Sequence, residues 1–360
     1  MKISMESLVR GLAAAKRVIP SIKTPRKILW EARLYERGGE PRLCATDLER
    51  GIDVALVGDA EKGEEVLLPV SEAAAALATI KDERVDVTRD AGSGHVTLRS
   101  DTARWSWSTG DPADFPGQPQ GKRAVAATLP RGRLRSGIER VIWAVAEDGS
   151  RYALNYMHLV VKEGGAVLLE GTDGKCLCRD EFPGGTSDAD ALFEPQAALA
   201  LLDVVGSEGE VELAVDDFAV KLRVGGSVGW AIASSFKFPP TDRIVPKVER
   251  EPSRVDGTLL AAAVKRASLA TVKESRALRL THEAGALLVS THNSVKSGDG
   301  GRVPHQGAPQ EEVLVSADYL KKALAGVEGE LSMWVGDGLV VFRAASREGW
   351  VAIVMPMTIG

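Results

Sequence analysis

The chain of 360 residues contains an internal repeat of about one third of its length. Phe-Pro at Phe115 recurs 123 positions later at Phe238, and Thr-Asp at Thr46 recurs 126 positions later at Thr172. A repeat constrains the fold more than any local pattern, because each copy must form the same supersecondary unit and pack against its neighbours. We therefore expect three similar domains. Their predicted boundaries are 1–120, 121–247 and 248–360.

Each repeat is expected to contain two helices and several strands. A segment of helical period opens every repeat, and a second helix follows an apolar strand end. The remaining segments are short alternating runs bounded by turn residues, which are typical of antiparallel strands. The opening helices are predicted at 5–19, 130–146 and 256–273, and the second helices at 72–80, 196–205 and 317–327. The predicted class is α+β, with two helices packed on antiparallel sheets in each domain.

One segment of the third repeat departs from this pattern. Residues Lys296–Pro309 are rich in glycine and contain proline and histidine. Long segments of this composition are commonly functional or mobile connections. We therefore interpret the segment as a mobile loop.

Charge is distributed unevenly along the chain. The formal net charge is -5, but the six predicted helices together carry +5 and the rest of the chain -10. The basic residues concentrate on the opening helix of each repeat, so an acidic chain can still present a positive lining to a polyanion. For any single side chain, a solvated helix face is the alternative interpretation. The opening helices contain Arg10, Lys16, Arg17, Arg131, Arg133, Arg135, Arg140, Lys265, Arg266 and Lys273.

The motifs of the common enzyme classes are absent from the sequence. There is no phosphate-binding glycine loop, no HExxH pair, no nucleophile elbow and no dinucleotide fingerprint. The three cysteines, Cys44, Cys176 and Cys178, lack the spacing of a metal or disulfide framework. Cys176 and Cys178 are expected on one face of a strand. We predict no catalytic residue, no metal and no cofactor, and, without a signal segment or long apolar run, a cytoplasmic protein with no membrane partner.

Several short motifs, taken in order, are similar to those of the bacterial sliding clamps, the beta subunits of DNA polymerase III. The resemblance extends over nearly the whole chain. The motifs are Ala45–Glu49, Ala113–Pro116, Arg151–Asn155, Gly171–Leu177, Phe238-Pro239 with Arg243–Pro246, and Val354–Met357. The resemblance implies a head-to-tail homodimeric ring of six similar domains, with helices lining a central hole and sheets forming the outer wall.

The function implied by the resemblance is that of a processivity factor and not of an enzyme. Such a clamp encircles double-stranded DNA without reading its sequence, and tethers its partners through clamp-binding peptides. The implied partners are a second copy of the chain, the DNA polymerase III alpha subunit, the clamp loader and repair polymerases. The alternative is a divergent clamp paralogue that acts as a protein-interaction hub without processive sliding. An unrecognised hydrolase is a third hypothesis, and it would require a pocket with convergent titratable groups.

The resemblance places the partner-peptide cleft between the second and third domains. Leu, Ile and Met side chains would form an adaptable apolar pocket there. For Met355 and Met357, core packing of a terminal strand is the alternative. The implied cleft residues are Leu154, Thr172, Gly174, Lys175, Cys176, Leu177, Pro239, Arg243, Ile244, Ser275, Ile353, Met355, Pro356 and Met357.

The chain departs from the family pattern at several of these places. Cys176 stands where relatives often have Arg, and Ser275 lies near the place of an aromatic residue. The chain ends in Thr358-Ile359-Gly360 instead of a basic-apolar pair. The segment 296–309 replaces a compact acidic stretch that in relatives helps to hold the subunit interface. We therefore expect an altered peptide preference.

The resemblance also assigns DNA contacts and a dimer interface. Alternation along residues 104–108 puts Trp105 and Trp107 on one face, and we predict that both anchor the dimer against Leu269 of the third domain. Core tryptophans within one domain are the alternative. The candidate DNA contacts are Lys23, Arg26, Arg151 and Tyr152 at the ring mouth, and Arg10, Lys16, Arg17, Arg133, Arg140, Lys265 and Arg266 in the lining.

Overall fold

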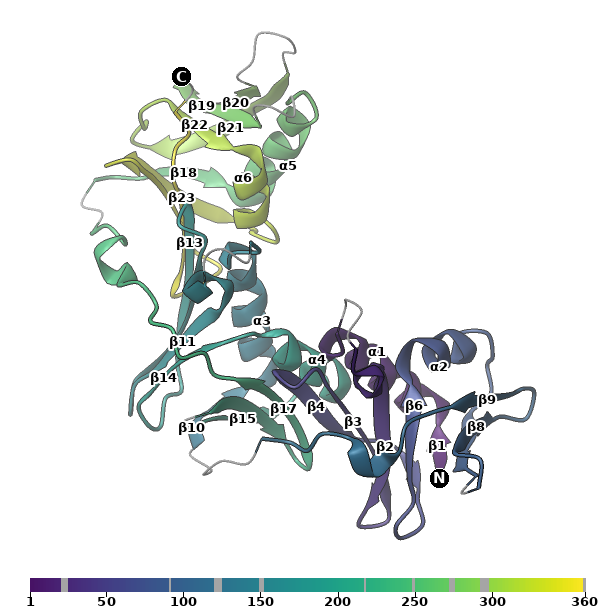
Figure 1. The fold of residues 1–360 in the computed structure, drawn as a ribbon. Coiled ribbons are helices and arrows are strands. Elements are labelled where there is room, and N and C mark those ends of the chain that lie inside the picture. Colours follow the sequence, from purple (N-terminus) through teal and green to yellow (C-terminus); the bar gives the residue numbers. More distant parts are fainter. Residues whose placement is uncertain are drawn as a thin grey trace. The chain divides into compact units, whose positions relative to one another are not determined.

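The computed structural model describes residues 1–20, 25–90, 92–119, 125–148, 152–216, 218–247, 250–271, 276–291 and 298–358. The chain divides into two compact units (Figure 1). The first unit consists of residues 1–138, 161–165 and 184–235, and the second of residues 139–160, 166–183 and 236–360. The division into three domains at the predicted boundaries stays a prediction.

The order of elements repeats three times along the described residues. Each third runs strand, helix, three strands, strand, helix, three strands, apart from short 3-10 turns and the additional strand β5. This order confirms the predicted α+β class with two helices in every repeat.

The bounds of the elements follow the repeats. The first contains β1 (Lys2–Ser4), α1 (Met5–Val18), β2 (Glu31–Arg37), β3 (Glu40–Thr46), β4 (Arg50–Ala55), β5 (Gly58–Asp59), β6 (Glu65–Pro69), α2 (Val70–Leu77), β7 (Arg84–Arg89), β8 (His95–Arg99) and β9 (Arg104–Ser108). The second contains β10 (Val125–Pro130), α3 (Arg131–Val141), β11 (Met157–Val161), β12 (Ala166–Thr172), β13 (Cys176–Pro183), β14 (Ala189–Phe193), α4 (Gln196–Val205), β15 (Glu210–Val215), β16 (Ala219–Val224) and β17 (Ser227–Ile232). The third contains β18 (Ser253–Asp256), α5 (Gly257–Ser268), β19 (Ala277–Glu283), β20 (Ala286–Thr291), β21 (Asp299–Gly307), β22 (Val313–Ser316), α6 (Ala317–Ala323), β23 (Glu330–Gly336), β24 (Leu339–Ala344) and β25 (Trp350–Val354).

The first unit is built on two antiparallel sheets. The larger has the strand order β10-β15-β16-β17-β4-β3-β2-β6, and the smaller β5-β1-β7-β8-β9. Figure 1 shows α1 and α4 side by side over the larger sheet. The sheet approaches α4 closely at Gly229, where a Cβ atom would lie 2.8 Å from the carbonyl oxygen of Ala197. Strands β17 and β4 join the second repeat to the first.

The second unit contains a long sheet in the order β11-β12-β13-β25-β24-β23-β18-β21-β20-β19-β22. Here β25 pairs with β13, which joins the third repeat to the second. The two junctions follow the same rule. In each, the last strand of one repeat pairs antiparallel with β4 or β13, the third of the three consecutive strands after the opening helix in the preceding repeat.

The interpretation of Lys296–Pro309 as a loop is wrong for most of the segment. Residues Asp299–Gly307 form the strand β21, which pairs with β20 and β18. Gly300 is needed for close packing, because a Cβ atom there would lie 2.2 Å from the carbonyl oxygen of Ala263 in α5. Gly301 has a φ of +97° beside an irregularity in the ladder. These glycines therefore serve a strand that lies against a helix.

Cys176 and Cys178 lie on one face of a strand, as predicted, and the structure shows that both are packed. Cys176 and Cys178 share one face of β13, where their Sγ atoms lie 3.9 Å from the carbonyl oxygen of Ala144 and 3.1 Å from that of Arg140. All three cysteines are free and buried, and burial raises the pKa of each thiol. Among the described residues, no group of three or more His, Cys, Asp or Glu could hold a metal ion. No described helix is long and apolar enough to cross a membrane.

Candidate functional site

The Thr-Asp-Gly motif of the second repeat forms a tight turn between β12 and β13. Thr172 Oγ1 donates to the carbonyl oxygen of Cys176 at 2.5 Å and accepts from the amide of Gly174 at 3.0 Å. Asp173 Oδ1 accepts from the amides of Lys175 and Cys176 at 2.8 and 2.9 Å. Gly174 has a φ of +85°, a conformation that glycine adopts without strain. The turn therefore holds Lys175 and Cys176 in fixed positions.

The first repeat contains the same turn. Thr46 Oγ1 donates to the carbonyl oxygen of Arg50 at 2.6 Å and accepts from the amide of Leu48 at 3.0 Å. Asp47 Oδ1 accepts from the amide of Arg50 at 2.8 Å. Leu48 has a φ of +85°, which is uncommon for a residue with a side chain. The repeated Thr-Asp motif therefore forms the same pattern of hydrogen bonds in both repeats.

Five predicted cleft residues meet at the junction of β13 and β25. Leu177 lies opposite Ile353 in the ladder, and both side chains are buried. The amide of Met355 donates to the carbonyl oxygen of Lys175 at 2.9 Å. Met355 is 49% exposed, which contradicts the alternative of core packing for this side chain. Cys176 is buried beneath the turn.

An apolar cluster that the sequence did not predict surrounds Leu177 and Ile353. Their side chains pack with Val341 and Val351, and half-buried Val245 packs against them. Trp334 and Leu339 complete this set, which we call the outer cluster. A pocket of about 230 Å³ adjoins it and is lined by Val341, Trp334 and Pro246 among others. Alternation along β24 is the signal that could have identified Val341.

The segment that follows Phe238-Pro239 is anchored by a buried carboxylate. Thr241 Oγ1 donates to Glu170 Oε2 at 2.6 Å, and Glu170 also lies 2.7 Å from Nδ1 of His158 and 3.2 Å from Nε of Arg179. The anchor leaves the following predicted residues, Arg243 and Ile244, exposed.

The other predicted cleft residues lie outside the group that meets at the junction of β13 and β25. Leu154 is half-buried, and its carbonyl oxygen accepts from the amide of Ala146 at 2.8 Å. Pro239 and Pro356 are half-buried. The amide of Met357 donates to the carbonyl oxygen of Leu314 at 2.8 Å. Ser275 lies outside the described residues.

Tyr319 of α6 is a further residue at this site that the sequence did not reveal. Its hydroxyl donates to Asp173 Oδ2 at 2.5 Å. Burial alone would raise the pKa of Asp173, but the hydrogen bonds from Tyr319 and from the amides of Lys175 and Cys176 hold this pKa below its usual value. The turn carboxylate is therefore ionised at neutral pH. Only the folded arrangement brings α6 to this turn.

Two candidate DNA contacts of the first unit, Arg10 and Arg17, meet at the end of one helix. Arg10 donates to the carbonyl oxygen of Val204 at 2.7 Å, and Arg17 pairs with Asp203 at 2.9 Å. Arg135 of α3 also pairs with Asp203. The C-terminal end of a helix favours cations, so α4 holds these three guanidinium groups together.

The remaining candidate DNA contacts differ in their surroundings. Arg140 pairs with the buried carboxylate of Asp180 at 3.3 Å, and Nε of Arg266 donates to the carbonyl oxygen of Gly300 at 2.9 Å. Tyr152 is 66% exposed and stacks on Phe236 with ring centroids 5.5 Å apart. Lys16, Arg26 and Lys265 are exposed, and Arg133 is half-buried. Lys23 and Arg151 lie outside the described residues.

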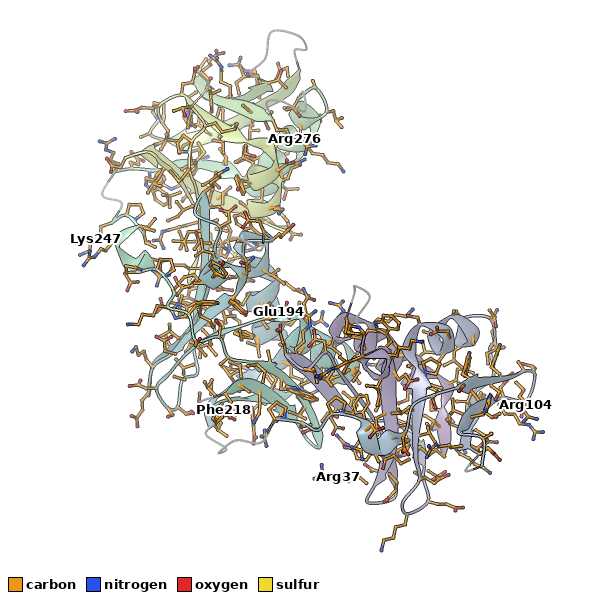
Figure 2. The ribbon with its side chains drawn as sticks, viewed as in Figure 1. Arg37, Arg104, Glu194, Phe218, Lys247 and Arg276 are labelled. Atoms are coloured by element: carbon orange, nitrogen blue, oxygen red, sulfur yellow. The ribbon has the colours of Figure 1, made fainter. Side chains whose placement is uncertain are left out.

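The predicted dimer residues lie at open positions. β9 is an edge strand, and Trp105 and Trp107 lie on its one face, opposite the buried Leu98 and Val96 of β8. Both tryptophans are only half-buried, and Arg104 at the start of the strand is exposed (Figure 2). Leu269, directly after α5, is 82% exposed.

Sequence comparison finds distant relatives of the chain, although no family model matches it. A beta sliding clamp of Pseudomonas putida is 26% identical over 323 residues, which cover 87% of this chain and 81% of the relative. A beta sliding clamp of Pseudomonas aeruginosa is 24% identical over 374 residues, with 97% and 95% covered.

Solved structures agree with the sequence relatives. The DNA polymerase III beta subunit of Pseudomonas aeruginosa superimposes with a TM-score of 0.84 at 22% identity, covering the whole of both chains. That of Thermotoga maritima gives a TM-score of 0.87 at 18% identity, covering 100% of this chain and 99% of the other. A sliding clamp of Bartonella birtlesii bound to griselimycin gives 0.88 at 18% identity, with the same coverage. By sequence the chain is a distant relative of the beta sliding clamps, and by fold it matches the DNA polymerase III beta subunits.

Proposed function

We propose that this chain is a DNA sliding clamp, a non-catalytic processivity factor that closes around duplex DNA as a homodimer. The observation that carries the proposal is the common rule of the two junctions. β17 pairs with β4 and β25 pairs with β13, but the corresponding strands β9 and β21 have no such partner among the described residues. A single chain therefore has one unpaired half of this junction in its first repeat, at β9, and the other half in its third repeat, at β21.

The incomplete burial of Trp107 in β9 supports the inference that this strand lacks a partner. By ladder register, Trp107 corresponds to Ala231 of β17 and to Val354 of β25. Ala231 and Val354 are 3% and 0% exposed, whereas Trp107 is only half-buried. A large apolar side chain at an open sheet edge is typical of an interface.

The complementary edge is the first half of β21. Asp299–Pro304 pair with β20, and only residues 305–307 continue into a ladder with β18. The helices agree with this arrangement. At the first junction α1 packs on α4, so the equivalent partner of α5 is α2 of another copy. On the third repeat, Leu259 and Leu269 are 50% and 82% exposed. A head-to-tail contact that closes after two copies gives a ring.

The basic residues of the opening helices are then proposed to line the ring. Contacts from Lys and Arg to phosphates are independent of sequence and depend on salt, as a sliding protein requires. Lys23, Arg26, Arg151 and Tyr152 are proposed to contact DNA at the mouth. The protein is accordingly assigned to the cytoplasm, where its DNA would be.

The junction of β13 and β25 is proposed as the partner-peptide cleft. Half-exposed Met355 and the half-buried Val245, Trp334 and Leu339 supply apolar surface over the buried side chains of the outer cluster. Arg243 supplies charge at the margin of this surface. The proposed occupants are clamp-binding peptides of the DNA polymerase III alpha subunit, the clamp loader and repair polymerases.

Retention on circular DNA tests the proposal. Protein loaded onto a nicked circular duplex should remain bound during gel filtration and leave when the duplex is cut once, because a ring slides off a free end. Equal retention on circular and linear DNA would point to ordinary electrostatic binding. A monomer that binds clamp-binding peptides without such retention would favour the interaction hub.

A further inference from the structure

The first unit contains a pocket of about 340 Å³ that the proposed function does not use. Its lining includes Arg37, Asp53, Gln118, Lys221, Arg223 and Trp230. It lies on the sheet face opposite α4, because Trp230 alternates along β17 with Gly229, which contacts that helix. A pocket of this size can hold a few side chains of a ligand.

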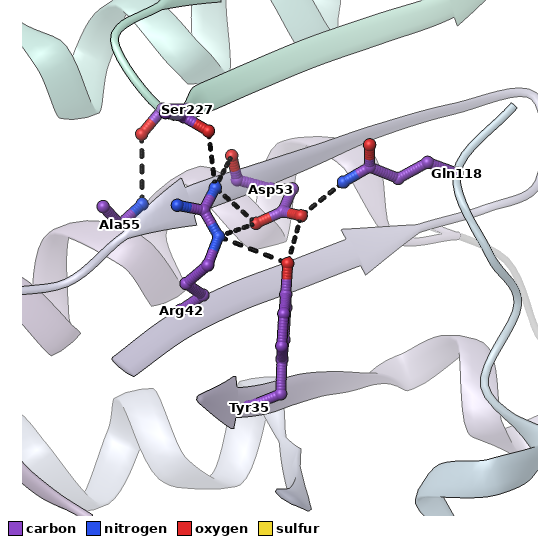
Figure 3. A network of polar contacts seen from close by, with 7 residues as sticks. Tyr35, Arg42, Asp53, Ala55, Gln118 and Ser227 are labelled. Atoms are coloured by element: carbon purple, nitrogen blue, oxygen red, sulfur yellow. Dashed lines mark hydrogen bonds and ion pairs between the residues drawn. The ribbon is translucent and has the colours of Figure 1, made fainter. Parts of the chain in front are cut away.

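A network of buried polar groups forms one wall of the pocket (Figure 3). The carboxylate of Asp53 accepts from Nε of Arg42 at 2.8 Å, from the hydroxyl of Tyr35 at 2.5 Å, and from the side-chain amide of Gln118. Asp53 and Arg42 are 1% and 4% exposed. The negative charge of Asp53 is thus neutralised within the wall and is not free for a ligand.

The cations of the pocket are compensated only in part. Lys221 pairs with Asp216 at 2.8 Å. Nε of Arg223 is buried and has no hydrogen-bond partner among the described residues. Arg37 is exposed at the end of β2 and forms no ion pair within the described part of the chain (Figure 2). A buried donor without a partner is costly, so Arg223 favours an anionic ligand.

The position of the pocket at the first junction is equivalent to the position of the outer cluster at the second junction. Trp230 lies opposite Gly51 as Ile353 lies opposite Leu177. On the next strand, Lys221 lies opposite Trp230 in the position that Val341 takes opposite Ile353. The position beside the large apolar side chain is therefore apolar at one junction, where it is Val341, and cationic at the other, where it is Lys221.

We propose that this pocket is a second docking site, which binds an acidic segment of a partner protein. Carboxylates of the segment pair with the guanidinium groups of Arg223 and Arg37, and an adjacent apolar side chain packs on half-buried Val228 of the pocket lining. The choice of a peptide rests on the proposed function of the equivalent surface at β13 and β25. The encircled DNA is not the ligand, since it would face the helices on the other side of the sheet.

Fluorescence anisotropy with a labelled probe tests the site. The probe is fluorescein-Gly-Gly-Asp-Leu-Asp-Leu-Gly, and its charge control replaces both Asp residues with Asn. Arg223→Ala and Arg37→Ala should each weaken probe binding about tenfold. The matched control is Arg343→Ala, which removes an exposed arginine from the equivalent position of β24 and should leave binding unchanged.

The results distinguish a specific second site from nonspecific attraction. Saturable binding of the Asp probe, its loss with the Asn probe, and insensitivity to Met355→Ala would support a second site distinct from the proposed cleft. Equal effects of Arg223→Ala and Arg343→Ala would show nonspecific attraction and overturn the proposal. So would the absence of saturable binding below about 1 mM, or full competition by equimolar inorganic phosphate.

Discussion

Gly51 lies directly beneath the indole of Trp230. A Cβ atom at Gly51 would be 2.2 Å from Cζ2 of Trp230 and 2.7 Å from the carbonyl oxygen of Ala45. At the other junction, the equivalent pair is Leu177 and Ile353, two residues of similar size. The first junction therefore accommodates the large side chain of Trp230 because Gly51 opposite has none. The outer surfaces of the two junctions differ as a result.

Gly51→Ala should lower the free energy of unfolding by about 1–3 kcal/mol, because the new methyl group overlaps the indole. Combining it with Trp230→Ala should recover part of this loss, since the carbonyl of Ala45 still crowds the site. Urea denaturation measures the effect. Gly117→Ala is the control, because nothing lies within 4 Å of a Cβ atom there. Equal stabilities of the two variants would disprove the close contact.

Tyr35 should titrate late. Burial, followed by its hydrogen bond to Asp53, raises the pKa of Tyr35 from 10.0 to about 12. Because the folded state holds this proton more tightly than the unfolded state, the stabilisation is complete below pH 10 and is lost as the pH rises towards 12. Tyrosinate absorbance should show one group, missing in Tyr35→Phe, that ionises near pH 12. Its ionisation near pH 10 would contradict the network in Figure 3.

Met355→Ala should weaken binding of a clamp-binding peptide, Gln-Leu-x-Leu-Phe, about tenfold, since a half-exposed apolar side chain leaves the proposed cleft. Ile232 provides a matched control. Its amide donates to the carbonyl oxygen of Glu49 as that of Met355 donates to Lys175, and its side chain is 37% exposed. Calorimetric titration should find Ile232→Ala unchanged. A larger effect of Ile232→Ala would move the peptide to the first junction.

Asp203→Asn should tighten DNA binding and steepen its salt dependence. The substitution removes the carboxylate that pairs with Arg17 and Arg135, so both guanidinium groups become available to phosphates. Anisotropy of a labelled duplex at several salt concentrations measures both quantities. Glu40→Gln is the control, because it removes one exposed carboxylate at the start of β3, away from the helices. If the two variants bind DNA equally, Asp203 does not restrain the helix arginines.

Local pattern predicted some elements well and failed at others for physical reasons. α4 has the predicted bounds 196–205, since its apolar period is uninterrupted. α3 ends at Val141, before the predicted residue 146, because Ile142–Ala144 tighten into a 3-10 turn. α2 begins at Val70, ahead of the predicted residue 72. β21 was missed because its glycines are required by contact with α5, and composition does not reveal such contacts.

The candidate sites show the same limit. Alternation alone placed Trp105 and Trp107 on one face of β9. The pair formed by Arg42 and Asp53 was not predicted, because it depends on the register of β3 and β4. Tyr319 reaches Asp173 from 146 positions away. Side-chain placement that follows from the alternation of a single strand could be predicted from the sequence. Contacts between side chains of different elements could not, because they depend on which elements become neighbours in the fold.

The central claim is that the edges of β9 and β21 left open in one chain close on those of a second copy. Hydrogen–deuterium exchange across the concentration at which the sedimentation mass doubles tests it most directly. Amides of Arg104–Ser108 and of Asp299–Gly301 should gain protection together, and Trp107→Ala should shift the doubling to higher concentration. A doubled mass with unchanged exchange in both segments would contradict the claim.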